Sequence, residues 1–427
     1  MPGKTNTTAA TAVAKPALLP KLRFPGFMDP WANEPLSEVL TEHRLKNTEG
    51  RDVFSVSMEH GIVNQIELLG RSFAASDTSH YTVGRRYDVV YTKSPLKAFP
   101  FGIVKQCKFD GEVALSPLYG VFTPKTPHVG LMIEAYFESP NRSIAFLTPL
   151  CQKGAKNTIQ ITNLTFLSGR LPLPTEVLEQ QKIADCLSSV DQVIAAQARK
   201  VEALRTHKKG LMQQLFPREG ETQPRLRFPE FQDDGRWEET RLGELGALVS
   251  GLTYSPDDVR ESGLLVLRSS NVQNGEIALD DNVFVDPSIK GANPSQPNDI
   301  LICVRNGSKA LIGKSALIPE GLPACTHGAF MTVFRAQAPR FVFQLFQTTR
   351  YQKQVAADLG ATINSINGSQ LLKYTFFVPK PPEQHRIASF LWSLDTLISA
   401  ETLKLGALQR HKRGLMQQLF PFREEEA

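Results

Sequence analysis

One stretch occurs twice in this chain: residues 207–217 read HKKGLMQQLFP and residues 411–421 read HKRGLMQQLFP. The second copy begins 204 residues after the first and differs by one Lys/Arg exchange. The same offset relates LRFP at 22–25 to LRFP at 226–229, and EQ and IA at 179–184 to EQ and IA at 383–388. The residues between these islands have diverged. Internal repetition at a fixed offset indicates a repeated structural unit, so the sequence predicts two similar halves that carry two different inserts.

Composition is that of an ordinary globular chain of 427 residues, with 41% hydrophobic and 21% charged residues. The formal net charge of +5 permits nucleic-acid binding without requiring it. Five scattered cysteines favour a reducing cytoplasm over a disulfide framework or a zinc site. No apolar run approaches the roughly 20 residues of a membrane span, and the Thr/Ala-rich residues 1–20 are expected to be a disordered tail.

The two inserts, about 41–171 and 246–378, have the pattern of mixed α+β domains. Short apolar runs at 52–57, 87–91, 119–122, 264–267, 300–304 and 331–334 are separated by Gly, Pro, Asn and Asp, as strands are. Residues 341–357 are predicted to be helical.

After each insert the apolar period changes to a heptad pattern, which is typical of a coiled coil. Ala198 and Lys208 are taken to complete the stripe in the first copy. The predicted spacer positions are Ile183, Leu187, Val190, Ile194, Val201, Leu204, Leu211, Leu215, Ile387, Leu391, Leu394, Ile398, Leu405, Leu408, Leu415 and Leu419.

A narrow apolar stripe needs a second helix, and the chain supplies one. If the second insert begins and ends at neighbouring points, the two helices must run antiparallel. We therefore predict an α+β protein in which two globular domains are separated by a long antiparallel two-helix coiled coil, with a pseudo-two-fold repeat. The expected segments are a tail (1–20), globular domain 1 (21–171), helix 1 (172–217), linker and globular domain 2 (218–378), helix 2 (379–421) and a tail (422–427). Phe24 is expected to lie near Phe420.

A basic chain with two unlike domains at a fixed separation suits a DNA site made of two unlike half-sites, because protein geometry sets half-site spacing. The helices would then act as the ruler between the half-sites.

Several motifs resemble those of the specificity subunits of Type I restriction–modification systems. Residues 173–184 (LPTEVLEQQKIA) and 378–388 (VPKPPEQHRIA) match the helix entry of that family. Residues 154–159 (GAKNTI) and 360–366 (GATINSI) resemble the segments that close its target recognition domains. Residues 116–119 (SPLY), 298–301 (NDIL), 305–308 (RNGS) and 312–314 (IGK) resemble motifs inside those domains. The likeness extends over about residues 22–421.

The resemblance implies a non-catalytic subunit that binds double-stranded DNA in the cytoplasm of a prokaryote. It would recruit two modification (methyltransferase) subunits and two restriction (translocase and nuclease) subunits. S-adenosylmethionine, ATP and Mg would bind those partners, and no cofactor or metal would bind this chain. In agreement, the sequence has no Asn/Asp-Pro-Pro-Tyr/Phe, Gly-x-x-x-x-Gly-Lys or His-Glu-x-x-His motif.

Forked donors on loops are the side chains that read base edges. On that basis the DNA-contacting candidates are Arg85, Arg86, Lys93, Lys97, Arg268, Ser269, Ser270, Asn271, Arg305, Asn306 and Lys309. The alternative for each is a solvated loop residue.

Two other functions stay open at this point. One is a stand-alone bipartite DNA-binding or scaffold protein without methyltransferase partners, which co-purification would distinguish. The other is an enzyme with its own active site, for which the sequence offers only scattered carboxylates. Gly210 and Gly414, which interrupt good helix, indicate a close helix approach, a partner contact or a tolerated kink.

Overall fold

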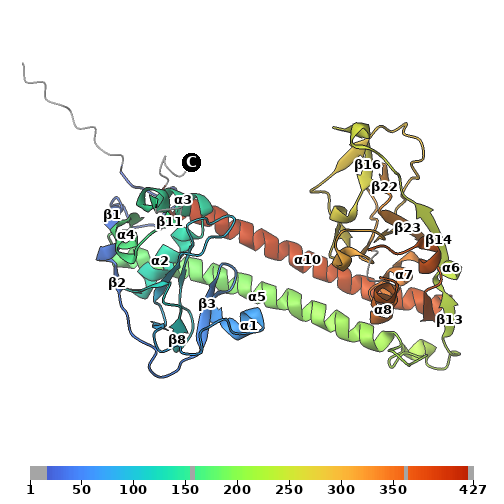
Figure 1. Ribbon diagram of the computed structural model, residues 1–427, viewed down its shortest axis with the longest axis horizontal. Helices are drawn as coiled ribbons and strands as arrows, with labels where there is room; N and C mark the ends of the chain where they lie inside the picture. The colour runs from blue at the N-terminus through green and yellow to red at the C-terminus, as the bar shows by residue number, and fades with distance from the viewer. Residues whose placement is uncertain (1–16, 154–158, 360–363, 422–427) are drawn as a thin grey trace, which may run out of the picture. The chain divides into compact units, whose positions relative to one another are not determined.

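The computed structural model describes residues 17–153, 159–359 and 364–421. The chain divides into two compact units, Met1–Ala196 with Lys404–Ala427 and Gln197–Leu403 (Figure 1). Most of the predicted tails lies outside the described residues. Residues 17–20 are described, and they correct the first tail: the amide N of Trp31 donates to the carbonyl O of Leu18 at 2.9 Å, and Leu18 packs on the core.

Unit 1 holds two four-stranded sheets and a strand pair that closes the domain. The first sheet has the order β2 (Leu40–Glu42), β9 (Gly120–Pro124), β6 (Val89–Thr92), β7 (Ile103–Gln106). The second has the order β4 (Gly61–Asn64), β3 (Val53–Ser57), β8 (Glu112–Leu115), β5 (Thr82–Arg85). Strand β1 (Ala32–Pro35) pairs with β12 (Arg170–Leu173), and β10 (Gln152–Lys153) with β11 (Ile159–Gln160). The short helices are α1 (Gln65–Leu69), α2 (Pro127–Phe137), α3 (Pro140–Leu147) and α4 (Asn163–Ser168).

Unit 2 holds two four-stranded sheets of its own. Their orders are β14 (Gly246–Ser250), β23 (Met331–Ala336), β20 (Ile300–Cys303), β21 (Ser315–Leu317) and β15 (Val259–Arg260), β19 (Val283–Val285), β16 (Leu264–Leu267), β22 (Cys325–His327). Strand β13 (Glu238–Arg241) pairs with β24 (Thr375–Val378), and β17 (Val272–Gln273) with β18 (Glu276–Ile277). The short helices are α6 (Leu242–Leu245), α7 (Pro339–Leu345), α8 (Thr349–Asp358) and α9 (Gly368–Leu371).

The two inserts share one topology although their sequences have diverged. In the order β2-β9-β6-β7, each strand has a counterpart in β14-β23-β20-β21. In the other sheets the parallel pair β3–β8 corresponds to the parallel pair β16–β22. The predicted α+β class is therefore confirmed, and strands lie where the runs at 264–267, 300–304 and 331–334 predicted them.

The helical character predicted for 341–357 is confirmed, and the chain forms it as two helices, α7 and α8, with a break between them. Thr348 starts α8 as its N-cap, and its side chain accepts from the amide N of Tyr351 at 3.4 Å. A hydroxyl that accepts from a free backbone N–H at a helix start stabilises that start. At Thr348 it favours a new helix over a continuation of α7.

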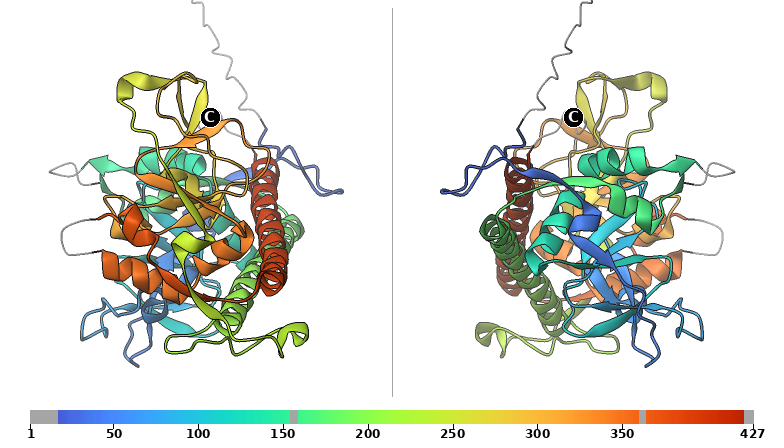
Figure 2. Two further views of the ribbon diagram at one scale, coloured as in Figure 1. Left: turned by 90° about the vertical axis from the view of Figure 1, so that its right-hand side faces the viewer. Right: turned by 90° about the vertical axis from the view of Figure 1, so that its left-hand side faces the viewer.

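The long helices α5 (Val177–Leu215) and α10 (Pro381–Leu419) lie within the predicted spacer segments. Helix α5 begins in unit 1 and ends in unit 2, and α10 does the reverse. Inside unit 1 the Nζ of Lys412 lies 2.7 Å from a carboxylate oxygen of Asp191. Inside unit 2 the Nζ of Lys208 lies 2.6 Å from Asp395, and that of Lys200 contacts Glu401. In unit 2 the contact partners rise along α5 as they fall along α10, so this stretch of the pair is antiparallel, as predicted. Figure 2 shows the two long helices beside each other.

All sixteen predicted stripe residues are buried or half-buried. Ala198 is exposed, however, and the neighbouring Gln197 is buried, which corrects one position of the stripe. With Gln197 and Lys208 included, the spacing alternates strictly between four and three. The Nε2 of Gln197 donates to the carbonyl O of Glu401 at 2.9 Å and to its carboxylate at 2.6 Å. No helix in the described part of the chain is both long and apolar enough to cross a membrane.

The repeated LRFP motif at residues 22–25 and 226–229, here called the frame motif, ties each domain to the start of one long helix. Arg23 binds the buried carboxylate of Glu179 with Nε and Nη2 at 2.7 and 2.9 Å. Arg227 binds Glu383 in the same bidentate way at 2.9 and 2.6 Å. These pairs fix the angle at which the chain enters α5 and α10, because a two-point contact allows little rotation.

The frame motif also contacts the end of the other long helix. In unit 1 the amide N of Leu22 donates to Gln418 O at 3.0 Å, and the rings of Trp31 and Phe420 meet edge to face at 6.0 Å. Phe24 packs on the core cluster that contains Phe420, which confirms the predicted proximity. Unit 2 repeats the backbone bond between Leu226 and Gln214, also at 3.0 Å.

Candidate nucleic-acid interface

In unit 2, two predicted loops meet beside the ends of β16 and β20. The Nδ2 of Asn306 donates to the Oγ of Ser269 at 3.0 Å, and the Oδ1 of Asn306 accepts from the amide N of Ser308 at 3.0 Å. The guanidinium of Arg305 lies over the ring of Phe330 at 5.7 Å. Arg305, Ser270 and Lys309 are exposed. The structure thus brings these predicted residues to one edge of the domain, where they present hydroxyl, amide and cationic groups.

Asn271 is a correction to the predicted set, since its side chain is 0% exposed. Its Oδ1 accepts from the amide N of Arg268 at 2.9 Å, and its Nδ2 donates to Ala278 O at 2.8 Å. A buried amide with both ends engaged holds the loop in shape and has no group left for a base. Sequence alone cannot separate this role from base reading, because Asn serves in both.

In unit 1 the four predicted cations are not brought together. Arg85 and Arg86 precede β6, whereas Lys93 and Lys97 follow it, so they lie at opposite ends of that strand. Arg85 is paired with Glu112 and Arg86 with Asp110, both at 3.0 Å. Exposed pairs of this kind are weak, so they do not prevent either guanidinium from binding another anion.

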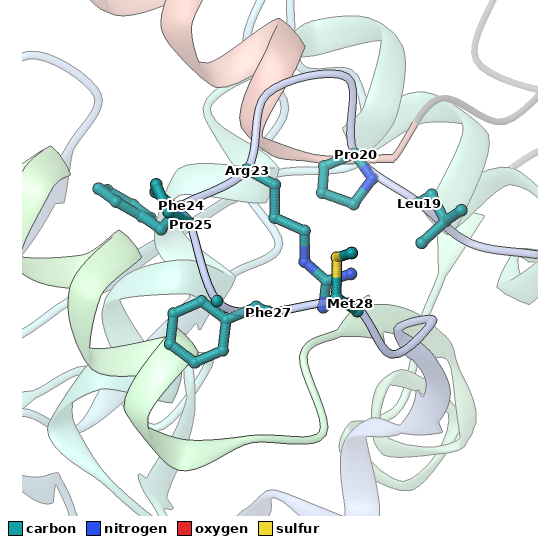
Figure 3. A pocket seen from close by; sticks show the side chains of 8 residues that line it. Leu19, Pro20, Arg23, Phe24, Pro25, Phe27 and Met28 are labelled. Carbon is teal, nitrogen blue, oxygen red and sulfur yellow. The ribbon is translucent and has the colours of Figure 1, made fainter.

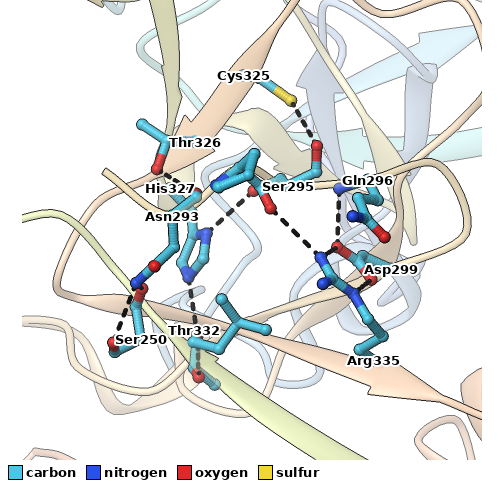
Figure 4. Close-up of polar contacts among 12 residues, drawn as sticks. Ser250, Asn293, Ser295, Gln296, Asp299, Cys325, Thr326, His327, Thr332 and Arg335 are labelled. Carbon is cyan, nitrogen blue, oxygen red and sulfur yellow. Dashed lines mark hydrogen bonds and ion pairs between the residues drawn. The ribbon is translucent and has the colours of Figure 1, made fainter. Parts of the chain in front are cut away.

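A buried polar network in unit 2 resembles part of a hydrolase site but cannot act as one (Figure 4). The Nδ1 of His327 lies 3.0 Å from the Oγ of Ser295, and its Nε2 lies 2.9 Å from the carbonyl O of Val249. A carbonyl only accepts, so Nε2 donates and Nδ1 accepts from the Ser295 hydroxyl. The ring is 0% exposed, and the nearby Asp299 is bound instead to Arg335 at 2.8 Å through two oxygens. The network therefore ties β22 to β14 and to the loop that contains Ser295.

A shallow hollow in unit 1 is formed by the first frame motif (Figure 3). Of its lining residues only Arg23 is charged, and its Nε and Nη2 are engaged by Glu179 and the carbonyl O of Asp29. It therefore offers no catalytic acid, base or nucleophile. The lining residues are Leu19, Pro20, Arg23, Phe24, Pro25, Gly26, Phe27 and Met28.

The sequence analysis noted Glu179 and Glu383 only as parts of the repeated EQ segments and missed their structural importance. Each lies 156 residues after an arginine of the repeated LRFP motif. In both copies an arginine and a glutamate recur at the same separation, and this recurrence could have indicated that they form a pair.

Comparisons with known proteins agree with this architecture. Residues 235–410 match the family model of the Type I restriction modification DNA specificity domain. Over 173 residues the chain is 29% identical to the Type I restriction enzyme StySPI specificity subunit of Salmonella potsdam, and 30% identical to the EcoKI specificity subunit of Escherichia coli strain K12. Each match covers 38% of this chain and 36% of the relative. The chain thus spans little more than a third of the length of these relatives.

The fold as a whole is that of a solved structure. The crystal structure of the S subunit of the Type I restriction–modification system from M. genitalium superposes with a TM-score of 0.60 at 14% identity. It covers 95% of this chain and 99% of that one. The resemblance predicted from the motifs is confirmed as a similarity: residues 235–410 match the model of the Type I DNA specificity domain, and the fold is shared with this S subunit.

Proposed function

We propose that this protein is the non-catalytic DNA specificity subunit of a Type I restriction–modification complex. One observation carries the proposal. The matched specificity domain and the first insert share a strand order, yet they present different side chains on their loops. Two domains of one design with different loop chemistry suit two unlike half-sites.

The partners belong to the same proposal. The frame residues repeat almost without change in both units, so two copies of one modification subunit could bind equivalent surfaces. These subunits would bind S-adenosylmethionine and methylate adenine, and restriction subunits using ATP and Mg would complete the complex. This chain itself would supply recognition and scaffolding in the cytoplasm of a prokaryote.

The test is a domain exchange. Residues 41–171 are replaced by the corresponding domain of a relative with a different target, and the full chain is co-expressed with its modification subunit. Mapping of methylated adenines in the host DNA should show one half-site changed and the other kept. A swap of residues 246–378 is the matched control and should change the other half-site. Methylation that keeps both half-sites, or loses both, would contradict the proposal.

A further inference from the structure

Each recognition domain has the same turn at the same place. Residues Ser116–Tyr119 join β8 to β9, and residues Gly328–Met331 join β22 to β23. In both turns the amide N of the fourth residue donates to the carbonyl O of the first, at 3.0 Å in unit 1 and 2.8 Å in unit 2. Because the flanking strands correspond in the two topologies, the third residues, Leu118 and Phe330, are equivalent.

Both third residues are large, apolar and exposed: Leu118 is 75% and Phe330 is 58% exposed. Turns favour small or polar residues for reasons of conformation and hydration. An apolar side chain that buries little surface contributes little to folding. A single exposed apolar residue needs no explanation, but recurrence at one position in two diverged domains does.

Leu164 shows the difference. It is also 75% exposed, in helix α4. Helix α9 follows its N-cap Asn367 as α4 follows its N-cap Thr162, which aligns Leu164 with Ser369. Its exposure therefore does not recur in the other domain.

In each domain a cation follows the end of the strand that pairs next to the turn. The carbonyl O of Phe330 accepts from the amide N of Arg305 at 3.1 Å, and the Arg305 guanidinium lies over the Phe330 ring. In unit 1, Tyr91 of β6 pairs with Gly120, which follows the turn, and Lys93 follows the end of β6. An apolar tip beside a positive charge matches duplex DNA, whose grooves expose thymine methyl groups between rows of phosphates.

We infer that Leu118 and Phe330 are specificity-determining residues, each in apolar contact with a base edge in the half-site of its own domain. Lys93 and Arg305 bind the adjoining phosphates. The inference rests on the proposed function and adds to it the side chains that meet the bases.

The experiment selects binding sites from a randomised duplex DNA library with the full chain and its co-expressed modification subunit. Wild type is compared with Leu118→Ala, Phe330→Ala and the control Leu164→Ala. Leu118→Ala should relax one or two adjacent positions in one half-site and weaken binding to the selected site about tenfold. Phe330→Ala should do the same in the other half-site. The slope of binding against salt should stay unchanged, since no phosphate contact is lost, and Leu164→Ala should behave as wild type.

The possible failures can be told apart. If wild type selects a two-part site and both alanine variants select the same site with the same affinity, the inference is overturned and the proposed function stands. Loss of the co-purified subunit with an unchanged DNA site would also overturn the inference, because it assigns these residues to a protein contact. If wild type selects no site at all, the proposed function fails.

Discussion

At the scale of single residues, His327 is a buried base that the fold keeps neutral. Burial of its ring lowers the pKa of His327 below the ordinary value of 6.5, although the hydrogen bond to Val249 and the charge of Asp299 oppose this and Arg335 adds to it. A protonated ring would also lose its acceptor for the Ser295 hydroxyl.

This arrangement predicts a pH-dependent stability. The folded protein binds the proton less tightly than the unfolded chain does, so the contribution of His327 is complete above about pH 6.5 and is lost as the pH falls below it. Urea unfolding of unit 2 can be measured in the full chain at pH 7.5 and at pH 5.5. Between these two pH values the unfolding free energy of wild type should fall by about 1 kcal/mol more than that of His327→Gln. The variant should be less stable at pH 7.5. An equal loss in both proteins would show that His327 is not the responsible group.

At the scale of the element, the repeated glycines of the long helices are not explained by packing within the chain. A Cβ added at Gly210 or Gly414 would meet no atom within 4 Å. Of the explanations that the sequence left open, close approach of the two helices is therefore wrong. A partner contact and a tolerated kink remain as hypotheses.

Gly210→Ala and Gly414→Ala should each raise the free energy of unfolding by up to about 1 kcal/mol, because alanine is the better helix former. Gly246→Ala is the opposite control, since its Cβ would lie 2.3 Å from the carbonyl O of Arg335 and should destabilise the protein. Urea denaturation measures all three. A loss of stability for Gly210→Ala in the isolated chain would mean that the helix depends on glycine at this point.

The elements also show what sequence could and could not predict. Heptad spacing found all sixteen stripe residues because burial along a helix follows a fixed period. The buried polar Gln197 was replaced in the prediction by its apolar neighbour Ala198, since its bond to Glu401 depends on the partner helix. Loop residues were predicted least well. Asn271 and Asn306 are both amides on loops, and only tertiary contacts distinguish the buried one from the exposed edge.

At the scale of the whole molecule, the frame is circular. The segment around Leu22 bonds to the end of α10 as the segment around Leu226 bonds to the end of α5. In unit 2 the covalent link between residues 217 and 226 holds the end of α5 beside the LRFP segment. In unit 1 noncovalent contacts alone hold the end of α10 beside the other LRFP segment.

A circular permutant tests this equivalence. Joining Ala427 to Met1 and opening the chain between Gly220 and Glu221 removes exposed contacts only. The permutant should keep its unfolding free energy within about 1 kcal/mol of wild type. A permutant opened between Ala196 and Gln197, inside α5, should lose much more unfolding free energy. If the two permutants lose the same unfolding free energy, the two junctions between a long helix and an LRFP segment are not equivalent.

Each unit borrows the end of a helix whose beginning lies in the other: α10 completes the unit of the first insert, and α5 that of the second. A polypeptide of half this length, with one insert and one helix, could make the same contacts by exchanging helices with an identical copy. The fold is thus what gene duplication and fusion of a helix-swapped homodimer would leave. Under the proposed function, such an ancestor would have presented the same loops twice to a palindromic DNA site, and recognition of an asymmetric site would have become possible only when one chain carried both inserts.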